Sequence, residues 1–184
     1  MARRRLANPL RILAPEMNRR IVILGFMACG KTTVGVALAR QLEGNFIDLD
    51  SQVTDNESHS PAQIIEADGE AAFREIETFA LRDVLQNRYA RVVALGGGTW
   101  TIAANRTLIA LHDCLTIWLD VPFELCWQRL SENKSAVRPL APDYQTALGR
   151  YESRRPIYAL AEQHVTVTAA DSVEKIIAQI LRQT

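Results

Sequence analysis

One segment near the start of the chain combines glycines, a lysine and hydroxyl groups at a spacing that suits phosphate chemistry. It runs Gly25-Phe-Met-Ala-Cys-Gly30-Lys31-Thr32, between the apolar run Ile21 to Leu24 and a helical pattern. Glycines at this spacing let backbone N–H groups surround phosphate oxygens, and the lysine adds a fixed positive charge. We therefore expect a phosphate loop that binds a nucleoside triphosphate. Its expected contacts are Gly25, Ala28, Cys29, Gly30, Lys31, Thr32 and Thr33.

Two carboxylates follow the next apolar run. Asp48 and Asp50 come at the end of Phe46 to Leu49, two residues apart, so that at a strand end both side chains would project from one face. Like charges that close are unfavourable unless a cation or a hydroxyl donor lies between them. Beside a phosphate loop, this pair predicts a site for Mg²⁺ and for the acceptor hydroxyl. We expect the Thr32 hydroxyl and Asp48 to be the metal ligands.

The elements that must position these residues alternate along the chain. Short apolar runs separated by helical stripes are typical of parallel strands joined by crossover helices. The predicted strands are Ile21 to Leu24, Phe46 to Leu49, Val92 to Leu95, Leu115 to Leu119 and Val165 to Thr168. The helical stripes are Val34 to Leu42, Phe73 to Val84 and Val173 to Leu181. Asp171 and Glu174 have the spacing of a reciprocal cap for the last helix. We predict an α/β fold, a doubly wound five-stranded parallel sheet flanked by helices.

Two polar segments interrupt this alternation. Residues 51–69 contain a short helix signal at Pro61 to Glu66, and residues 131–142 carry two prolines and no continuous apolar face. In doubly wound sheets, ligands bind beyond the carboxyl ends of the strands, where such connections lie. We expect a substrate-binding segment at about 51–80 and a mobile lid at about 131–142, both within a single domain of residues 21–184.

The composition excludes several classes of protein. Of the 184 residues, 48% are hydrophobic and 23% are charged, which suits one globular domain able to bury a core. The longest apolar stretch is too short to cross a bilayer. Cys29, Cys114 and Cys126 lack the spacing of a disulfide framework or a metal site, so we expect a cytoplasmic protein.

The charges are balanced overall but unevenly distributed. The chain has 21 Lys plus Arg and 21 Asp plus Glu. Residues 1–20 hold six arginines against one glutamate, a net charge of plus five, so residues 21–184 sum to minus five. We interpret residues 1–20 as a basic, disordered leader. Alternatively, the translation start has been assigned too early and the protein begins at Met17. We expect catalysis to survive deletion of residues 1–16. An acidic body without a basic stripe argues against nucleic-acid binding.

The phosphate loop alone does not distinguish a kinase from a GTPase or a transport ATPase. The guanine-reading pattern Asn-Lys-x-Asp fails in Asn133-Lys134-Ser135-Ala136, which lacks the final carboxylate. A transport ATPase usually ends a buried strand in a metal-binding Asp, and Asp120 has that position. However, Asp120 also precedes Val121-Pro122, where a helix begins, and a capping role explains it more simply.

Six motifs, taken in order, resemble those of the shikimate kinase family. They span the chain from Ile21 to its end, and outside the phosphate loop each is weakly specific alone. The motifs are Gly25 to Thr33, Asp48-Leu-Asp50, Gly69-Glu70-Ala-Ala-Phe73-Arg74 with Glu77, Gly96-Gly97-Gly98, Arg138-Pro139-Leu140 and Arg154-Arg155-Pro156-Ile157-Tyr158. The resemblance implies a monomeric phosphate-loop kinase with a mobile lid. It would transfer phosphate from ATP to the 3-hydroxyl of shikimate, with Mg²⁺, in the biosynthesis of chorismate and aromatic amino acids.

The resemblance also implies roles for individual residues. Arg74 and Arg154 would bind the shikimate carboxylate, for which the planar guanidinium is suited. Asp50 would accept from the ring hydroxyls and act as base, and the backbone of Gly96, Gly97 and Gly98 would approach the ring. Lys31 and Arg138 would contact the ATP phosphates, and Arg129 would lie against the adenine.

Three features depart from the family pattern. Ala28 replaces a loop glycine, which costs about 1 kcal/mol or more if its φ is positive. The lid between Arg129 and Arg138 is longer than in many members of the family, which leaves the role of Lys134 open. Trp100 either narrows the site or packs on the lid or the adjoining helix.

Other functions stay open. The alternatives are a phosphate-loop kinase of gluconate or a nucleoside monophosphate, and a non-catalytic nucleic-acid module that uses the leader.

Overall fold

Five parallel strands form the central layer of the protein, in a computed structural model that describes residues 19–132 and 139–183. The strands are β1 (Ile21–Leu24), β2 (Asn45–Asp48), β3 (Ala90–Ala94), β4 (Leu115–Asp120) and β5 (Gln163–Thr166). Their order across the sheet is β2-β3-β1-β4-β5, and every neighbouring pair is parallel. The predicted fold class is therefore confirmed.

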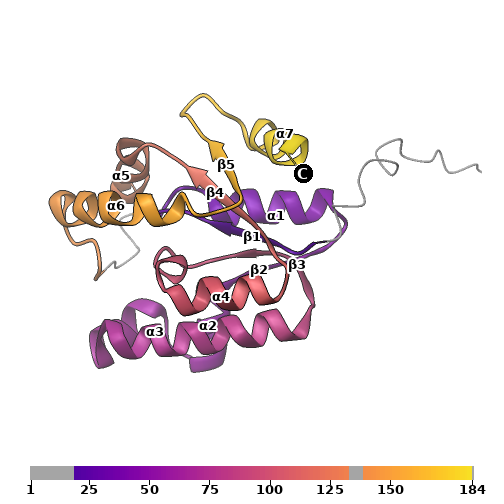
Figure 1. The fold of residues 1–184 in the computed structure, drawn as a ribbon. Helices are drawn as coiled ribbons and strands as arrows, with labels where there is room; N and C mark the ends of the chain where they lie inside the picture. Colours follow the sequence, from indigo (N-terminus) through magenta and orange to yellow (C-terminus); the bar gives the residue numbers. More distant parts are fainter. Residues whose placement is uncertain (1–18, 133–138, 184) are drawn as a thin grey trace, which may run out of the picture.

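Helices cover both faces of this sheet. They are α1 (Lys31–Gln41), α2 (Leu49–Glu57), α3 (Pro61–Asn87), α4 (Ala103–Leu111), α5 (Phe123–Glu132), α6 (Tyr144–Tyr158) and α7 (Val173–Gln183), with a short 3-10 helix η3 (Thr99–Thr101). Figure 1 shows α1 and α7 above the strands and α3 and α4 below them. All four residues of the central strand β1 are buried, as expected for a strand covered on both faces. No helix in the described ranges has the length and apolarity needed to span a membrane.

Several predicted boundaries differ from the structure, including those of β3, which spans Ala90–Ala94 instead of Val92 to Leu95. Strand β2 ends at Asp48, because the Asp48 carboxylate accepts from the Asp50 backbone N–H and starts helix α2 at Leu49. The expected short helix at Pro61 is the first part of α3, which runs on to Asn87 with a kink at Gly69 (φ 86°, ψ 168°). Strand β5 begins at Gln163, two residues before its predicted start.

The predicted reciprocal cap of the last helix is wrong. The Ser172 hydroxyl accepts from the Lys175 N–H at 3.3 Å and so caps this helix. The carboxylate of Asp171 instead accepts from Thr168 and pairs with the Lys175 ammonium at 2.5 Å. Asp171 therefore closes the turn that precedes α7.

Two residues of the predicted leader lie on the domain. Arg19 pairs with Asp113 and Glu162, and Arg20 donates to the carbonyl oxygens of Val84 and Leu85. The remaining leader, residues 1–18, lies outside the described residues, and so does the lid segment 133–138 with Lys134 and Arg138.

Candidate active site

The phosphate loop connects β1 to α1 through three residues with positive φ. They are Gly25 (144°), Ala28 (57°) and Gly30 (98°), and Gly30 is the N-cap of α1. A side chain at residue 25 would approach Cys29 Sγ and the Leu119 carbonyl to 2.9 Å, so this position requires glycine for space as well as conformation. The N–H groups in the first turn of α1 have no partner within the helix and are available for an anion.

Lys31 reaches back over this loop. Its Nζ donates to the carbonyl oxygens of Gly25 and Phe26, at 3.1 and 2.9 Å. It also lies 3.9 Å from Cys29 Sγ, which is buried. The positive charge is therefore held against the phosphate loop.

Thr32 and Asp48 meet across the gap between α1 and β2. Thr32 Oγ1 donates to Asp48 Oδ2 at 2.5 Å, while Asp48 Oδ1 accepts from the Asp50 N–H at 3.0 Å. A hydroxyl and a carboxylate oxygen are ligands that Mg²⁺ prefers, and this ion usually keeps several waters and binds substrate phosphates. The described residues hold no cluster of three or more His, Cys, Asp or Glu side chains suited to a metal. The donor set present here therefore fits Mg²⁺ shared with a nucleotide.

A pocket of about 530 Å³ surrounds these residues. It includes every predicted loop contact from Ala28 to Thr33 together with Asp48 and Asp50. Arg129, at the end of α5, also lines it and donates to the Ala28 carbonyl at 3.3 Å. The lining residues that were not predicted include Val167, Asp171, Val173 and Ile176. They come from α7 and from the connection between β5 and α7, more than a hundred residues after the phosphate loop, and no local pattern pointed to them.

A second, smaller pocket of about 120 Å³ lies next to the first. Arg74, Arg154, Gly97 and Gly98 line it, as do Pro139 and Leu140 from the far side of the lid segment. Met27, Asp50 and Gly97 line both pockets. Asp50 therefore lies at the wall shared by the two cavities, in the first turn of α2 rather than at the predicted strand end.

Burial and neighbouring carboxylates raise the pKa of Asp50 to about 6. Burial is the largest cause, and the charges of Glu77 and Asp48 add to it, while Lys31 and Arg74 oppose it. A carboxylate with such a pKa is still ionised at neutral pH and is a stronger proton acceptor than an ordinary aspartate.

Arg74 is held by two glutamates on its own helix. Its guanidinium contacts Glu77 at 2.6 Å and Glu70 at 3.0 Å, and Glu70 also pairs with Arg150 of α6. Glu77 is fully buried and accepts from the Thr99 hydroxyl at 2.6 Å. No role was predicted for these glutamates, although Glu77 and Glu70 stand three and four residues from Arg74, on the same helical face.

The three glycines after β3 serve different purposes. A Cβ at residue 96 would approach Asp50 Oδ1 to 2.7 Å and overlap Glu77, and a Cβ at residue 98 would overlap the Arg74 guanidinium. Gly96 does not line the smaller pocket. The missing side chains at residues 96 and 98 therefore make room for the protein's own side chains. The approach of these glycines to a ligand stays a prediction.

Of the two adjacent arginines in α6, Arg154 points inward. It is 7% exposed, and its Nη1 donates to the Gly97 carbonyl at 3.2 Å. Arg155 instead pairs with Asp120 at 2.8 Å on the surface. Trp100 is buried and donates to the Ile157 carbonyl, so it docks α6 and does not line either pocket. A buried guanidinium without a carboxylate partner is suited to binding an anionic ligand.

Comparison with known proteins agrees with this arrangement. The family model described as shikimate kinase matches residues 27–184. A shikimate kinase of Synechococcus sp. (strain JA-3-3Ab) is 40% identical over 178 residues, which cover 92% of each chain. Among solved structures, shikimate kinase from Acinetobacter baumannii in complex with shikimate has a TM-score of 0.78 and 32% identity, covering 90% of this chain and 91% of that one. The shikimate kinase of Bacteroides thetaiotaomicron has a TM-score of 0.78 at 28% identity, covering 90% and 97%. The chain belongs to the shikimate kinase family.

Proposed function

We propose that this protein transfers the γ-phosphoryl group of ATP to the 3-hydroxyl of shikimate, which yields shikimate 3-phosphate and ADP. The observation that carries the proposal is the position of Asp50. Its carboxylate lies at the wall shared by a phosphate-binding pocket and by a small pocket lined with two arginines. A donor phosphate and an acceptor hydroxyl bound in these pockets would meet beside one proton acceptor.

The acceptor pocket suits a small carboxylate. Arg74 is fixed by Glu70 and Glu77, and Arg154 is buried with one carbonyl partner, so both guanidinium groups are oriented before substrate binds. Two fixed guanidinium groups favour a planar carboxylate. A volume of about 120 Å³ lies well below the roughly 300 Å³ at which pockets for larger ligands begin, which disfavours a nucleoside monophosphate as acceptor.

In the reaction, the shikimate 3-oxygen forms a bond to the γ-phosphorus as the bond from that phosphorus to the β–γ bridging oxygen breaks. The hydroxyl proton moves to the Asp50 carboxylate. Lys31 and the loop amides stabilise the charge on the phosphates, and placement of the two substrates supplies most of the rate. Mg²⁺, when bound, neutralises phosphate charge, and Thr32 and Asp48 would hold it. Arg138 is proposed to contact the phosphates and Arg129 the adenine.

The proposal extends to a monomer in the cytoplasm. A monomer is what the resemblance to the family implies. Cys29, Cys114 and Cys126 are all free and buried, which suits a reducing compartment. Size-exclusion chromatography with light scattering tests whether the protein is a monomer, and a mass of two chains would contradict it.

A coupled assay of ADP release tests the activity. We expect strong stimulation by shikimate in the presence of Mg²⁺, and little by gluconate or by nucleoside monophosphates. Absence of stimulation by shikimate would overturn the proposal. Removal of Mg²⁺ with EDTA should abolish turnover, and excess Mg²⁺ should restore it.

A further inference from the structure

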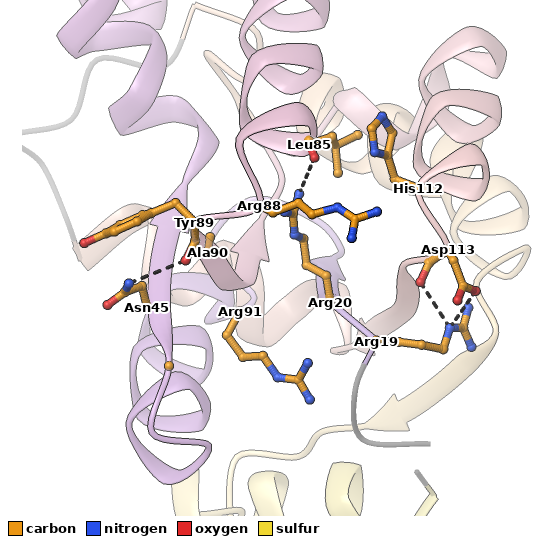
Figure 2. A pocket seen from close by; sticks show the side chains of 11 residues that line it. Arg19, Arg20, Asn45, Leu85, Arg88, Tyr89, Ala90, Arg91, His112 and Asp113 are labelled. Atoms are coloured by element: carbon orange, nitrogen blue, oxygen red, sulfur yellow. Dashed lines mark hydrogen bonds and ion pairs between the residues drawn. The ribbon is translucent and has the colours of Figure 1, made fainter. Parts of the chain in front are cut away.

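A third pocket lies at the opposite edge of the sheet from the active site. It has a volume of about 650 Å³ and is lined by Arg19, Arg20, Gly44, Asn45, Leu85, Arg88, Tyr89, Ala90, Arg91, His112 and Asp113 (Figure 2). These residues precede or open β1, β2, β3 and β4, whereas the phosphate loop follows the carboxyl end of β1. At about 3.3 Å per residue, Arg20 and Gly25 are separated by about 17 Å along the strand. The pocket is therefore separate from both substrate sites.

Four of the lining side chains are arginines, and Arg19 is already neutralised. It contacts Asp113 at 3.0 Å and Glu162 at 2.9 Å, and donates to the carbonyl oxygens of Asp113 and Cys114. These contacts anchor the start of the described chain to the domain. Arg19 is thus a structural residue of this pocket.

The charge of Arg20 is balanced in part by the C-terminus of α3. Its Nη1 donates to the carbonyl oxygens of Val84 and Leu85, at 3.0 Å each, in the last turn of α3. Cations are stabilising at helix C-termini, where carbonyl groups are left without partners. Burial lowers the pKa of Arg20, and the charge of Arg88 adds to this effect. The Nε and Nη2 groups of Arg20 have no hydrogen bond among the described residues.

Arg88 and Arg91 have no partner of this kind among the described residues. Neither makes a hydrogen bond or an ion pair within the described parts of the chain, while Figure 2 shows them on either side of Arg20. The stem of Arg91 packs so closely over Gly44 that a Cβ there would overlap it, which fixes the side chain against the pocket wall. Burial lowers the pKa of Arg91, and no carboxylate offsets this effect.

The pocket keeps a surplus of positive charge even when the partial negative charges of the nearby helix C-termini are included. The four arginines exceed Asp113 and Glu162 by two charges. The C-termini of α3 and α4, which end at Asn87 and Leu111, contribute about half a negative charge each. About one positive charge is therefore uncompensated, concentrated on Arg88 and Arg91 next to the partly free Arg20.

We propose that this pocket binds a small anion with two or more phosphate groups, held by Arg20, Arg88 and Arg91. Guanidinium groups form paired hydrogen bonds with phosphate oxygens. The volume falls within the range of small-molecule sites. A long nucleic acid fits less well, because residues 21–184 have a net charge of minus five and so offer no extended basic surface.

Inorganic pyrophosphate is the probe for this site, titrated by calorimetry into the full chain. Saturating ADP, with EDTA and no Mg²⁺, fills the phosphate loop and keeps metal from sequestering the probe. The test variant is R88Q/R91Q, and its control is R82Q/R182Q, which removes two exposed arginines on α3 and α7 that do not line the pocket. The basic leader is unchanged in all of them. We expect one equivalent bound by wild type and control within about twofold of each other, and binding at least about tenfold weaker in R88Q/R91Q.

Two further measurements distinguish the loss of the arginine charges from a loss of folding. R88K/R91K retains the charges and should bind pyrophosphate more tightly than R88Q/R91Q. Unchanged turnover and thermal midpoint show that the variants are folded; if the double variant unfolds, R88Q and R91Q are measured singly. Equal pyrophosphate affinity in wild type and R88Q/R91Q overturns the proposal, as does absence of binding to wild type. Binding of a single-stranded oligonucleotide that is lost in R88Q/R91Q, without pyrophosphate binding, would also overturn it in favour of an extended polyanion.

Discussion

Gly98 leaves the space that the Arg74 guanidinium occupies. A Cβ at residue 98 would overlap Nη1, Nη2 and Cζ of Arg74, so the backbone at the end of β3 and an arginine in the middle of α3 fit together only when residue 98 has no side chain. The carboxylate-binding geometry of the proposed acceptor pocket therefore depends on this glycine as well as on the arginine.

G98A should consequently displace Arg74 and weaken shikimate binding. We expect the KM for shikimate to rise at least about tenfold, with the KM for ATP changed little, because the nucleotide pocket does not include residue 98. G149A in α6 is the matched control, since a Cβ there meets nothing within 4 Å. The control should keep wild-type kinetics and gain up to about 1 kcal/mol in stability. Equal KM values in G98A and wild type would contradict the role given to this contact.

D50N should reduce turnover by orders of magnitude while ATP affinity stays nearly unchanged, because the variant removes the proton acceptor. The pKa of Asp50 of about 6 also predicts the pH dependence of the wild type. Turnover should be half-maximal near pH 6, approach its full value by pH 8 and fall at lower pH, since the protonated carboxyl cannot accept. Steady-state rates from pH 5 to 8 measure this limb. Near-wild-type turnover in D50N would exclude Asp50 as the base.

The stability of D50N provides a check that is independent of catalysis. The pKa of Asp50 is raised in the folded protein from an ordinary value of 3.8, so ionisation costs folding stability. This cost develops between pH 4 and 6 and is complete above pH 6. The thermal midpoint of D50N should therefore exceed that of wild type at pH 7.5, and the difference should shrink as the pH approaches 4.

Part of this site could be predicted from sequence because its chemistry is local. The phosphate loop depends on consecutive backbone conformations, and glycine spacing reveals them directly. Thr32 and Asp48 were both predicted as metal ligands, one from the phosphate-loop pattern and one from the end of the next strand, and the structure brings the two side chains together. Asp50 was expected at the site, but on a strand, because Asp-Leu-Asp-Ser fits a strand end and a helix start equally well.

The remaining contacts arise from elements that are distant in the chain. Glu77 approaches Thr99 because α3 packs beside the turn after β3, a contact across 22 residues. The choice between Arg154 and Arg155 is fixed by the docking of α6, where Tyr158 donates to the Gly97 carbonyl at 2.5 Å. Two adjacent arginines have the same charge and cannot be distinguished by spacing. The family resemblance selected Arg154, and this packing gives the physical reason. The arginine pocket at the amino ends of the strands likewise combines residues from four separate regions of sequence.

Arg154 and Arg155 form a matched pair for mutation. R154A should raise the KM for shikimate by about two orders of magnitude, because it removes a buried cation from the acceptor pocket. R155A removes an exposed ion pair with Asp120 and should change the KM less than about threefold. Steady-state kinetics with both substrates varied measure these values. The opposite order of effects would contradict the inward orientation of Arg154.

E77Q should alter the pH profile as well as substrate binding. Glu77 holds Arg74 and lies near Asp50, and its charge is one cause of the raised pKa of Asp50. Loss of that charge should increase the KM for shikimate and move the acid limb of turnover to lower pH. A purely structural effect would lower activity without moving the limb, so a limb that stays near pH 6 would contradict the coupling of these carboxylates.

Ala28 provides a test of strain in the phosphate loop. Its φ of 57° lies in the left-handed region, which costs a non-glycine residue about 1 to 2 kcal/mol. A28G should relieve this strain, although the added freedom of glycine in the unfolded chain offsets about 0.4 to 1 kcal/mol of the gain. We therefore expect a small increase in thermal midpoint and a KM for ATP that is equal or several-fold lower. A37G, in the middle of α1, is the control, and should destabilise the protein by about 1 kcal/mol because that alanine is helical. If A28G and A37G destabilise the protein equally, residue 28 is not strained, and the family's preference for glycine there has another cause.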